Sequence, residues 1–275
     1  MTTNTKMTES EYRAHPALNF TDLKAIETSP LHFKEIRDHG HDSSKAFDFG
    51  SLVHMAALEL AQFNKSTVIL PDGIKKGNSN AYKEFKAEHE GKHILSPEED
   101  GLYRHIANKV HSDEHAKALL KSRGTEFEVP LFWEYRGHKL KSKTDWRNPS
   151  AKRRPHMGDL KSTETISPDA FLKKAYKFHY HAQFWYYQAA NEYNTGERLP
   201  FYVVAVEKKR PFDVAVFHVP DETLDYGKDT VDRWLDEYER CLESKHWPGV
   251  AAGEILTFKL PEWVSSDGDE DLVID

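Results

Sequence analysis

The first part of the chain carries apolar residues at helical spacing, separated by polar connections. Thr21 is a candidate N-cap for a helix that runs through Leu23, Ile26 and Phe33. The remaining patterns predict an apolar helix over 49–60 (FGSLVHMAALEL), a loop over 62–79, a charged helix over 80–90 and a helix from Ser96-Pro97 to about Lys121. These patterns together predict a helical region over roughly residues 1–122.

The period of the pattern changes in the middle of the chain. Residues 126–135 and 139–146 predict two strands, joined by a turn at Arg136-Gly137. Residues 156–161 predict a short third strand, separated from the second by a basic loop. The expected fold class is therefore α/β (α+β), with strands inserted between helical segments.

A long helical pattern follows the third strand. Ser167-Pro168 marks its expected start, Tyr193 its last turn and Gly196 its C-terminal stop. Residues 201–206 are wholly apolar, which is typical of a strand buried on both faces. A strand over 214–219 and a helix over 221–244 complete the predicted elements.

Length allows one large domain or two small ones, and the absence of an internal repeat or a clean linker predicts a single domain over residues 1–263. Of the 275 residues, 38% are hydrophobic, which is enough for a sizeable core. We expect the core of the domain over 123–245, and an acidic, disordered tail over 264–275, because SSDGDEDLVID is poor in apolar residues. One cysteine, Cys241, excludes a disulfide framework and a four-thiolate metal site. The absence of a signal-like or membrane-spanning apolar run predicts a cytoplasmic protein.

Charge is distributed unevenly along the chain. The net charge is −7, yet residues 136–161 alone carry +7, so the rest of the chain carries −14. A basic segment in an acidic protein can attract phosphate, although a charge run is often only a solvated loop.

Carboxylates lie within this basic segment. Asp145 follows Lys143-Thr144, and Asp159 and Lys161 lie two apart, so on a strand both side chains point to the same face. Mg²⁺ prefers carboxylate oxygens, and an adjacent lysine can orient a water or stabilise a developing charge. The pattern indicates metal-dependent phosphodiester hydrolysis, with surface ion pairs as the alternative.

Six motifs in a fixed order support the catalytic interpretation. They are TESEYRAHPALNFTDLK with SPLHF, FGSLVHMAALE, EVPLFW, KSKTDW, GDLKST and YHAQFWYY. Over roughly residues 7 to 245 the chain resembles the exonuclease VIII (RecE-like) family of phages and prophages. That family is in the RecB-like branch of the PD-(D/E)XK nuclease superfamily. The resemblance implies a central mixed β-sheet flanked by helices, with a helical N-terminal region.

The resemblance assigns roles to several residues. Asp145 and Asp159 would be the central metal ligands, with His54, the carbonyl of Leu160 and Glu128 completing the site. Glu126 is a rival for Glu128 because it lies two residues away on the same strand face. Lys161 would lie beside the attacking water. The expected cofactor is Mg²⁺, two ions per site, with Mn²⁺ as a substitute. The alternative for His54 is a histidine packed on an apolar helix.

Further residues are expected to contact DNA. Gln183 and Tyr187 fit the Q-x-x-x-Y signature of RecB-like nucleases and share one helix face, and Gln183 could bond either a phosphate or the lysine. The alternative is core packing of an aromatic helix. The basic loop, with Arg147, Lys152, Arg153 and Arg154, is expected to hold phosphates.

The resemblance also implies an activity and partners. The enzyme would digest linear double-stranded DNA from the 5′ end and leave 3′ overhangs for a single-strand annealing protein, acting as a homo-oligomeric ring. The alternatives are another RecB-like endonuclease, a single-strand-specific repair nuclease, or a noncatalytic DNA-binding module. The chain has neither the four cysteines of cluster-bearing relatives nor a phosphate-binding loop of the Walker type.

Overall fold

The computed structural model describes residues 7–40, 45–151 and 154–259. Its first elements are helical, and a short two-stranded parallel sheet lies among them. They are α1 (Glu9–Ala14), α2 (Phe20–Lys24), the 3₁₀ helix η1 (Ala25–Glu27), α3 (Pro30–His39), α4 (Lys45–Leu58), α5 (Leu60–Ser66), β1 (Thr67–Ile69), α6 (Asn80–Glu88), β2 (His93–Leu95), α7 (Pro97–Ser112) and α8 (Glu114–Leu120).

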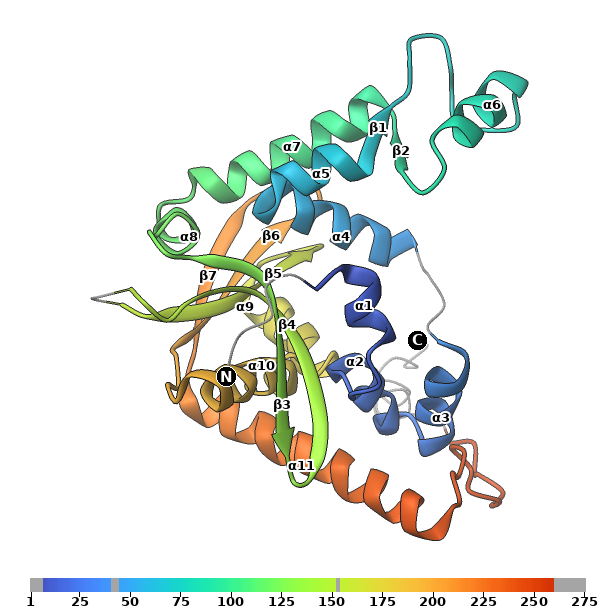
Figure 1. The fold of residues 1–275 in the computed structure, drawn as a ribbon, viewed down its shortest axis with the longest axis vertical. Coiled ribbons are helices and arrows are strands. Elements are labelled where there is room, and N and C mark those ends of the chain that lie inside the picture. Colours follow the sequence, from blue (N-terminus) through green and yellow to red (C-terminus); the bar gives the residue numbers. More distant parts are fainter. Residues whose placement is uncertain (1–6, 41–44, 152–153, 260–275) are drawn as a thin grey trace, which may run out of the picture.

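The centre of the molecule is a five-stranded mixed sheet with strand order β3-β4-β5-β6-β7 (Figure 1). Pairing is antiparallel except between β5 and β6, which are parallel. The elements are β3 (Glu126–Tyr135), β4 (His138–Asn148), β5 (His156–Thr163), α9 (Pro168–Lys177), α10 (Tyr180–Thr195), β6 (Phe201–Glu207), β7 (Val214–Val219) and α11 (Asp221–Ser244). The predicted mixed sheet flanked by helices is confirmed.

Helices cover both faces of this sheet, and the side chains of β6 show why. Val203 and Ala205 point into a core shared with α2, α3, α10 and α11, whereas Val204 and Val206 point into a second core shared with α4, α5 and α7. Successive side chains of a strand alternate between the two faces of the sheet. A strand that is covered by helices on both faces, as β6 is, therefore needs apolar side chains at every position.

Several predicted helix boundaries are wrong for local reasons. Asn19, rather than Thr21, caps α2, since its side chain accepts the N–H of Asp22 at 2.9 Å. The predicted loop over 62–79 begins with the end of α5 and β1. The single long helix predicted after Ser167 is two helices, because His179 adopts a left-handed conformation (φ 57°) between α9 and α10.

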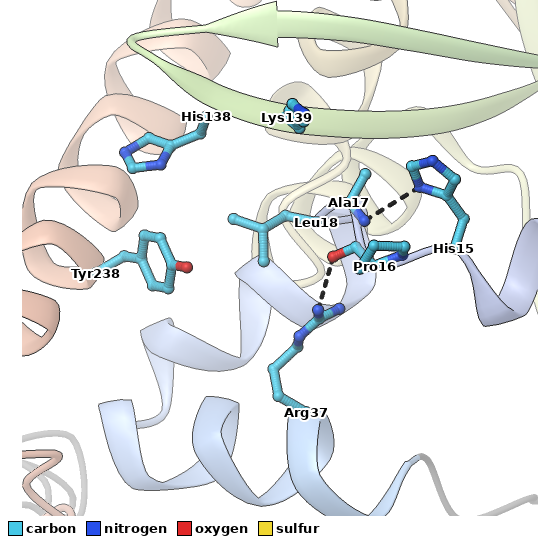
Figure 2. Close-up of a pocket in the computed structure, with 8 residues that line it drawn as sticks. All are labelled: His15, Pro16, Ala17, Leu18, Arg37, His138, Lys139 and Tyr238. Carbon is cyan, nitrogen blue, oxygen red and sulfur yellow. Dashed lines mark hydrogen bonds between the residues drawn. The ribbon is translucent and has the colours of Figure 1, made fainter.

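A cavity of about 240 Å³ lies between α3, α11 and the start of β4 (Figure 2). Two of its lining side chains are engaged in the fold: Arg37 pairs with Asp22 at 2.9 Å and bonds the Pro16 carbonyl, and His138 Nε2 lies 2.9 Å from Glu239. The cavity is near the β3–β4 turn, roughly 20 Å along the strand from Asp145 at ~3.3 Å per residue. It is therefore separate from the carboxylates described below. No helix among the described residues is long and apolar enough to cross a membrane.

Candidate active site

The carboxylates lie where β4 separates from β5. The two strands pair over Trp146–Asn148 and His156–Gly158 only, while β5 continues alongside β6 to Thr163. At the point of separation, the Asp145 carboxylate accepts the backbone N–H of Leu160 at 2.7 Å. A side-chain carboxylate thus satisfies a donor that the strand ladder leaves free, and the sheet opens beside Asp145.

Gly158 permits the close packing just before this opening. A Cβ at this residue would lie 2.2 Å from the indole of Trp146 and 2.2 Å from the carbonyl oxygen of Tyr202. No side chain fits there, so the glycine preceding Asp159 holds β5 tightly between its neighbours.

Three side chains from different elements converge at the opening. His54 of α4 places Nδ1 3.3 Å from Oδ2 of Asp145 on β4. One ligand atom from each of His54, Glu128 and Asp145 lies within 4.8 Å of the others. A nitrogen and two carboxylates at this separation can share one divalent cation.

The backbone of Glu128 is unusual. Its φ is +51°, a region that residues with side chains rarely adopt. It interrupts the ladder between β3 and β4, which pairs Phe127 with Trp146 and Val129 with Thr144 but omits the position between them. That omitted partner is Asp145, so the strained residue lies opposite a carboxylate of the cluster.

The electrostatics of the cluster fit a cation. Burial, followed by the neighbouring charge of Asp145, raises the pKa of Glu128 to about 7. Burial and the charge of Asp159 raise the pKa of Asp145 well above its ordinary range. Burial lowers the pKa of His54, which favours the neutral imidazole that binds metal. Without a cation the site therefore contains excess negative charge that it partly neutralises by holding protons.

Asp159 forms a separate pair with Lys161. The Lys161 ammonium lies 2.6 Å from Oδ1 of Asp159, whose side chain is almost fully buried. The Asp159 carboxylate is therefore paired directly with the lysine. Burial opposes the charge on Lys161, but Asp159 and Asp145 outweigh it and raise the pKa of the lysine. The ammonium therefore stays charged.

Gln183 and Tyr187 extend this pair along α10. Lys161 donates to Oε1 of Gln183 at 2.9 Å, and Nε2 of Gln183 donates to the Tyr187 hydroxyl at 2.9 Å. Of the two partners expected for Gln183, the structure places the lysine within reach. The Q-x-x-x-Y pair orients the lysine through this chain of hydrogen bonds.

The structure separates Glu126 and Arg147 from the cluster. Arg147 is 4% exposed, pairs with Oε2 of Glu126 at 2.8 Å and donates to Asn191 at 3.2 Å. Glu128, and not Glu126, is thus the glutamate beside Asp145. Arg154 is exposed, and the predicted contacts Lys152 and Arg153 lie outside the described residues.

Sequence reasoning missed two residues at the site. Lys143 Nζ lies 3.0 Å from Oε2 of Glu128 and 2.8 Å from Oε2 of Glu9, which comes from α1. Lys143 lies two residues before Asp145, so strand alternation could have placed both on one face. Nothing in the local pattern indicated that Glu9 would reach the same lysine.

A comparison with known protein families identifies the family of this chain. Residues 19–261 match a family described as PDDEXK-like domain of unknown function (DUF3799). The chain belongs to this family. The match covers most of the chain, including every described member of the cluster, Asp159 and Lys161. No similar protein was found among curated sequences.

One solved structure supports the fold of this PDDEXK-like chain. A protein described as a "putative exonuclease" from Eubacterium rectale aligns with a TM-score of 0.64 at 17% identity, over 96% of this chain and 99% of that chain. At this identity the likeness establishes the fold alone. A second structure, SSO0001, aligns with a TM-score of 0.29 at 12% identity, over 69% of this chain and 86% of that chain, which is too low to support the fold.

Adding Mg²⁺ is expected to raise the Tm more at about pH 8 than at about pH 5.5. The pKa of Glu128 rises from 4.5 to about 7 on folding, so the folded state binds its proton more tightly. The metal-free protein therefore loses stability as pH rises through this range, and a cation that binds the deprotonated site restores it. Differential scanning fluorimetry measures the shift. An equal shift in Asp145→Asn would contradict metal binding at this cluster.

Proposed function

We propose that the protein is a metal-dependent deoxyribonuclease that digests linear double-stranded DNA from its ends. The observation that carries the proposal is the convergence of His54, Glu128 and Asp145 beside the Asp159–Lys161 pair, where β4 separates from β5. Buried like charges with raised pKa values are typical of functional sites, and carboxylates grouped in this way can hold a metal for phosphodiester hydrolysis.

His54, Glu128 and Asp145 are suited to hold Mg²⁺, with Asp159 and the carbonyl of Leu160 as further oxygen ligands. When bound, the metal would supply charge stabilisation at the scissile phosphate. The protein fixes the donors in advance: Leu160 N–H orients Asp145, and Lys143 balances Glu128. Pre-set ligands reduce the reorganisation needed during the reaction.

Lys161 is the group proposed to act on the reacting phosphate. Its ammonium is fixed between Asp159 and Gln183, so it can donate a further hydrogen bond in one direction. A positioned cation is most effective where charge develops, at the phosphate oxygens or at the incoming water.

The order of the sequence motifs supports a more specific proposal, namely an activity like that of exonuclease VIII. The resemblance to exonuclease VIII supports 5′-to-3′ digestion that leaves 3′ overhangs, a homo-oligomeric ring and delivery of the single strand to an annealing protein. The fold shared with the E. rectale protein, itself described as a "putative exonuclease", is consistent with this assignment.

Digestion of end-labelled linear duplex with Mg²⁺ tests the proposal. We expect release of nucleotides from the linear duplex, none with EDTA, and none from a covalently closed circle of the same sequence, because an exonuclease requires an end. Comparison of duplexes labelled at the 5′ end with duplexes labelled at the 3′ end shows the direction of digestion. Asp145→Asn serves as the control for contaminating nucleases. Cleavage of the circle would indicate an endonuclease, and binding without digestion would indicate a noncatalytic module.

A further inference from the structure

Aromatic and basic side chains alternate at the junction of α9 and α10, beside the candidate active site. Phe178 is the C-cap residue of α9, and its side chain is 43% exposed. The ring of Tyr180, at the start of α10, lies nearly parallel to it, with centroids 6.1 Å apart and planes inclined by 25°. These two rings form a small apolar surface that no function assigned above uses.

A lysine accompanies each ring. Nζ of Lys174 lies 6.0 Å from the centre of the Phe178 ring and donates to Oγ1 of Thr163 at 3.1 Å. Nζ of Lys161 lies 4.6 Å from the centre of the Tyr180 ring. Because Lys161 also contacts Asp159, the rings link the protein surface directly to the candidate active site.

The charge around the rings is positive. Lys174 and Lys208 are both bonded to Thr163: the side chain of Lys174 donates to its hydroxyl, and the backbone N–H of Lys208 donates to its carbonyl at 2.8 Å. Burial, and then repulsion from Lys208, lowers the pKa of Lys174. The neighbouring acid, Glu164, pairs with Lys209 at 2.9 Å. An anion placed near Lys174 and Lys208 would relieve their repulsion.

We propose that Phe178, Tyr180 and Lys174 form a platform for unpaired nucleotides of a single DNA strand next to the active site. A base would stack on Phe178 while Lys174 and Lys208 hold its phosphate. The occupant is single-stranded because the faces of paired bases are covered by their neighbours in a duplex, whereas aromatic rings and lysines together fit unstacked bases. This inference deepens the proposed function, since it names the form in which the strand enters the site.

Fluorescence anisotropy with labelled oligothymidylate in EDTA tests the platform without digestion. Loss of one stacked base is expected to weaken binding by roughly 5- to 150-fold in Phe178→Ala. Phe178→Trp should restore binding, because it restores a stacking surface, and Phe178→Leu should not. Lys174→Met should weaken binding and reduce its salt dependence by about 0.7 in log–log slope.

Tyr193→Ala is the matched control. Tyr193 is 51% exposed and lies near the opposite end of α10, so its loss should leave oligothymidylate binding unchanged. Normal binding by Phe178→Ala, an equal loss in Tyr193→Ala, or equal binding by Phe178→Leu and Phe178→Trp would each overturn the platform. Circular dichroism verifies that each variant is folded.

The platform and the proposed function can fail separately. If the wild type digested no DNA but Phe178→Ala lost oligothymidylate binding, the platform would be supported and the nuclease proposal refuted. Digestion by the wild type with unchanged binding by Phe178→Ala would refute the platform and leave the nuclease standing.

Discussion

Replacing Asp145 with asparagine is expected to slow DNA digestion by about 100- to 10,000-fold, the scale of losing a pre-set electrostatic element. Asparagine keeps the shape and retains an oxygen that can accept the Leu160 N–H, which the carboxylate accepts at 2.7 Å. The charge that would bind metal is lost, however. Timed digestion of linear duplex at saturating Mg²⁺ measures the effect.

Although Asp145→Asn should lose activity, its stability without metal is not expected to fall. Burial and Asp159 raise the pKa of Asp145, which means that its ionised form is unfavourable in the metal-free fold. Asparagine removes that charge, so the metal-free Tm of Asp145→Asn should equal or exceed that of the wild type at about pH 8. If both the Tm and the activity of Asp145→Asn fell strongly, Asp145 would instead have a structural role.

The glutamates of β3 provide a matched comparison. Glu128→Gln should reduce activity strongly, because Glu128 lies in the cluster with His54 and Asp145. Glu126→Gln should stay within about twofold of the wild-type activity, because Glu126 lies outside that cluster and the amide oxygen of glutamine can still accept the hydrogen bond from Arg147. The opposite ranking would show that the strand is placed out of register with the site.

Strong local patterns made most of the fold predictable. Two strands joined at Arg136-Gly137 and an apolar strand over 201–206 follow from alternation and burial, which are local properties. The break at His179 could not be predicted, since a left-handed histidine is stabilised by its surroundings rather than by its own preference. Motif order, more than periodicity, indicated the sheet topology.

The candidate metal ligands and the lysine beside them could be named from the sequence, but the ion pairs that surround them could not. The motifs named His54, Asp145, Asp159 and Lys161, and the structure brings them to one region. The charge pattern did not reveal that Arg147 is buried against Glu126, because a sequence does not show which charges a fold neutralises. The positive φ of Glu128 is likewise a tertiary effect that its neighbours in sequence do not signal.

These pairings suggest two functional halves around the opening of the sheet. His54, Glu128 and Asp145 form a carboxylate-rich half with excess negative charge, whereas Lys161 with Gln183 and Tyr187 forms a half that presents a fixed cation. Asp159 lies between them, since it touches Lys161 and also raises the pKa of Asp145. Variants of the two halves should therefore fail in different steps.

Replacing Lys161 with methionine is expected to lower kcat by about 100- to 1,000-fold while metal binding largely survives. The ammonium donates to Gln183 at 2.9 Å and lies 2.6 Å from Asp159, outside the cluster of His54, Glu128 and Asp145. The substitution keeps an unbranched side chain, one atom shorter, and removes its charge. Single-turnover digestion measures the rate, and calorimetry measures Mg²⁺ affinity.

The metal dependence of stability gives a second readout for the same variant. Removing Lys161 leaves the buried carboxylate of Asp159 without its cation, which typically destabilises a fold by about 3 to 5 kcal/mol. A divalent ion can replace that charge, so Mg²⁺ should raise the Tm of Lys161→Met more than that of the wild type. Asp159→Asn should show the reverse, with weaker Mg²⁺ binding and a smaller shift. If Lys161→Met lost Mg²⁺ binding as completely as Asp145→Asn, the lysine would be holding the metal site together rather than acting on the phosphate.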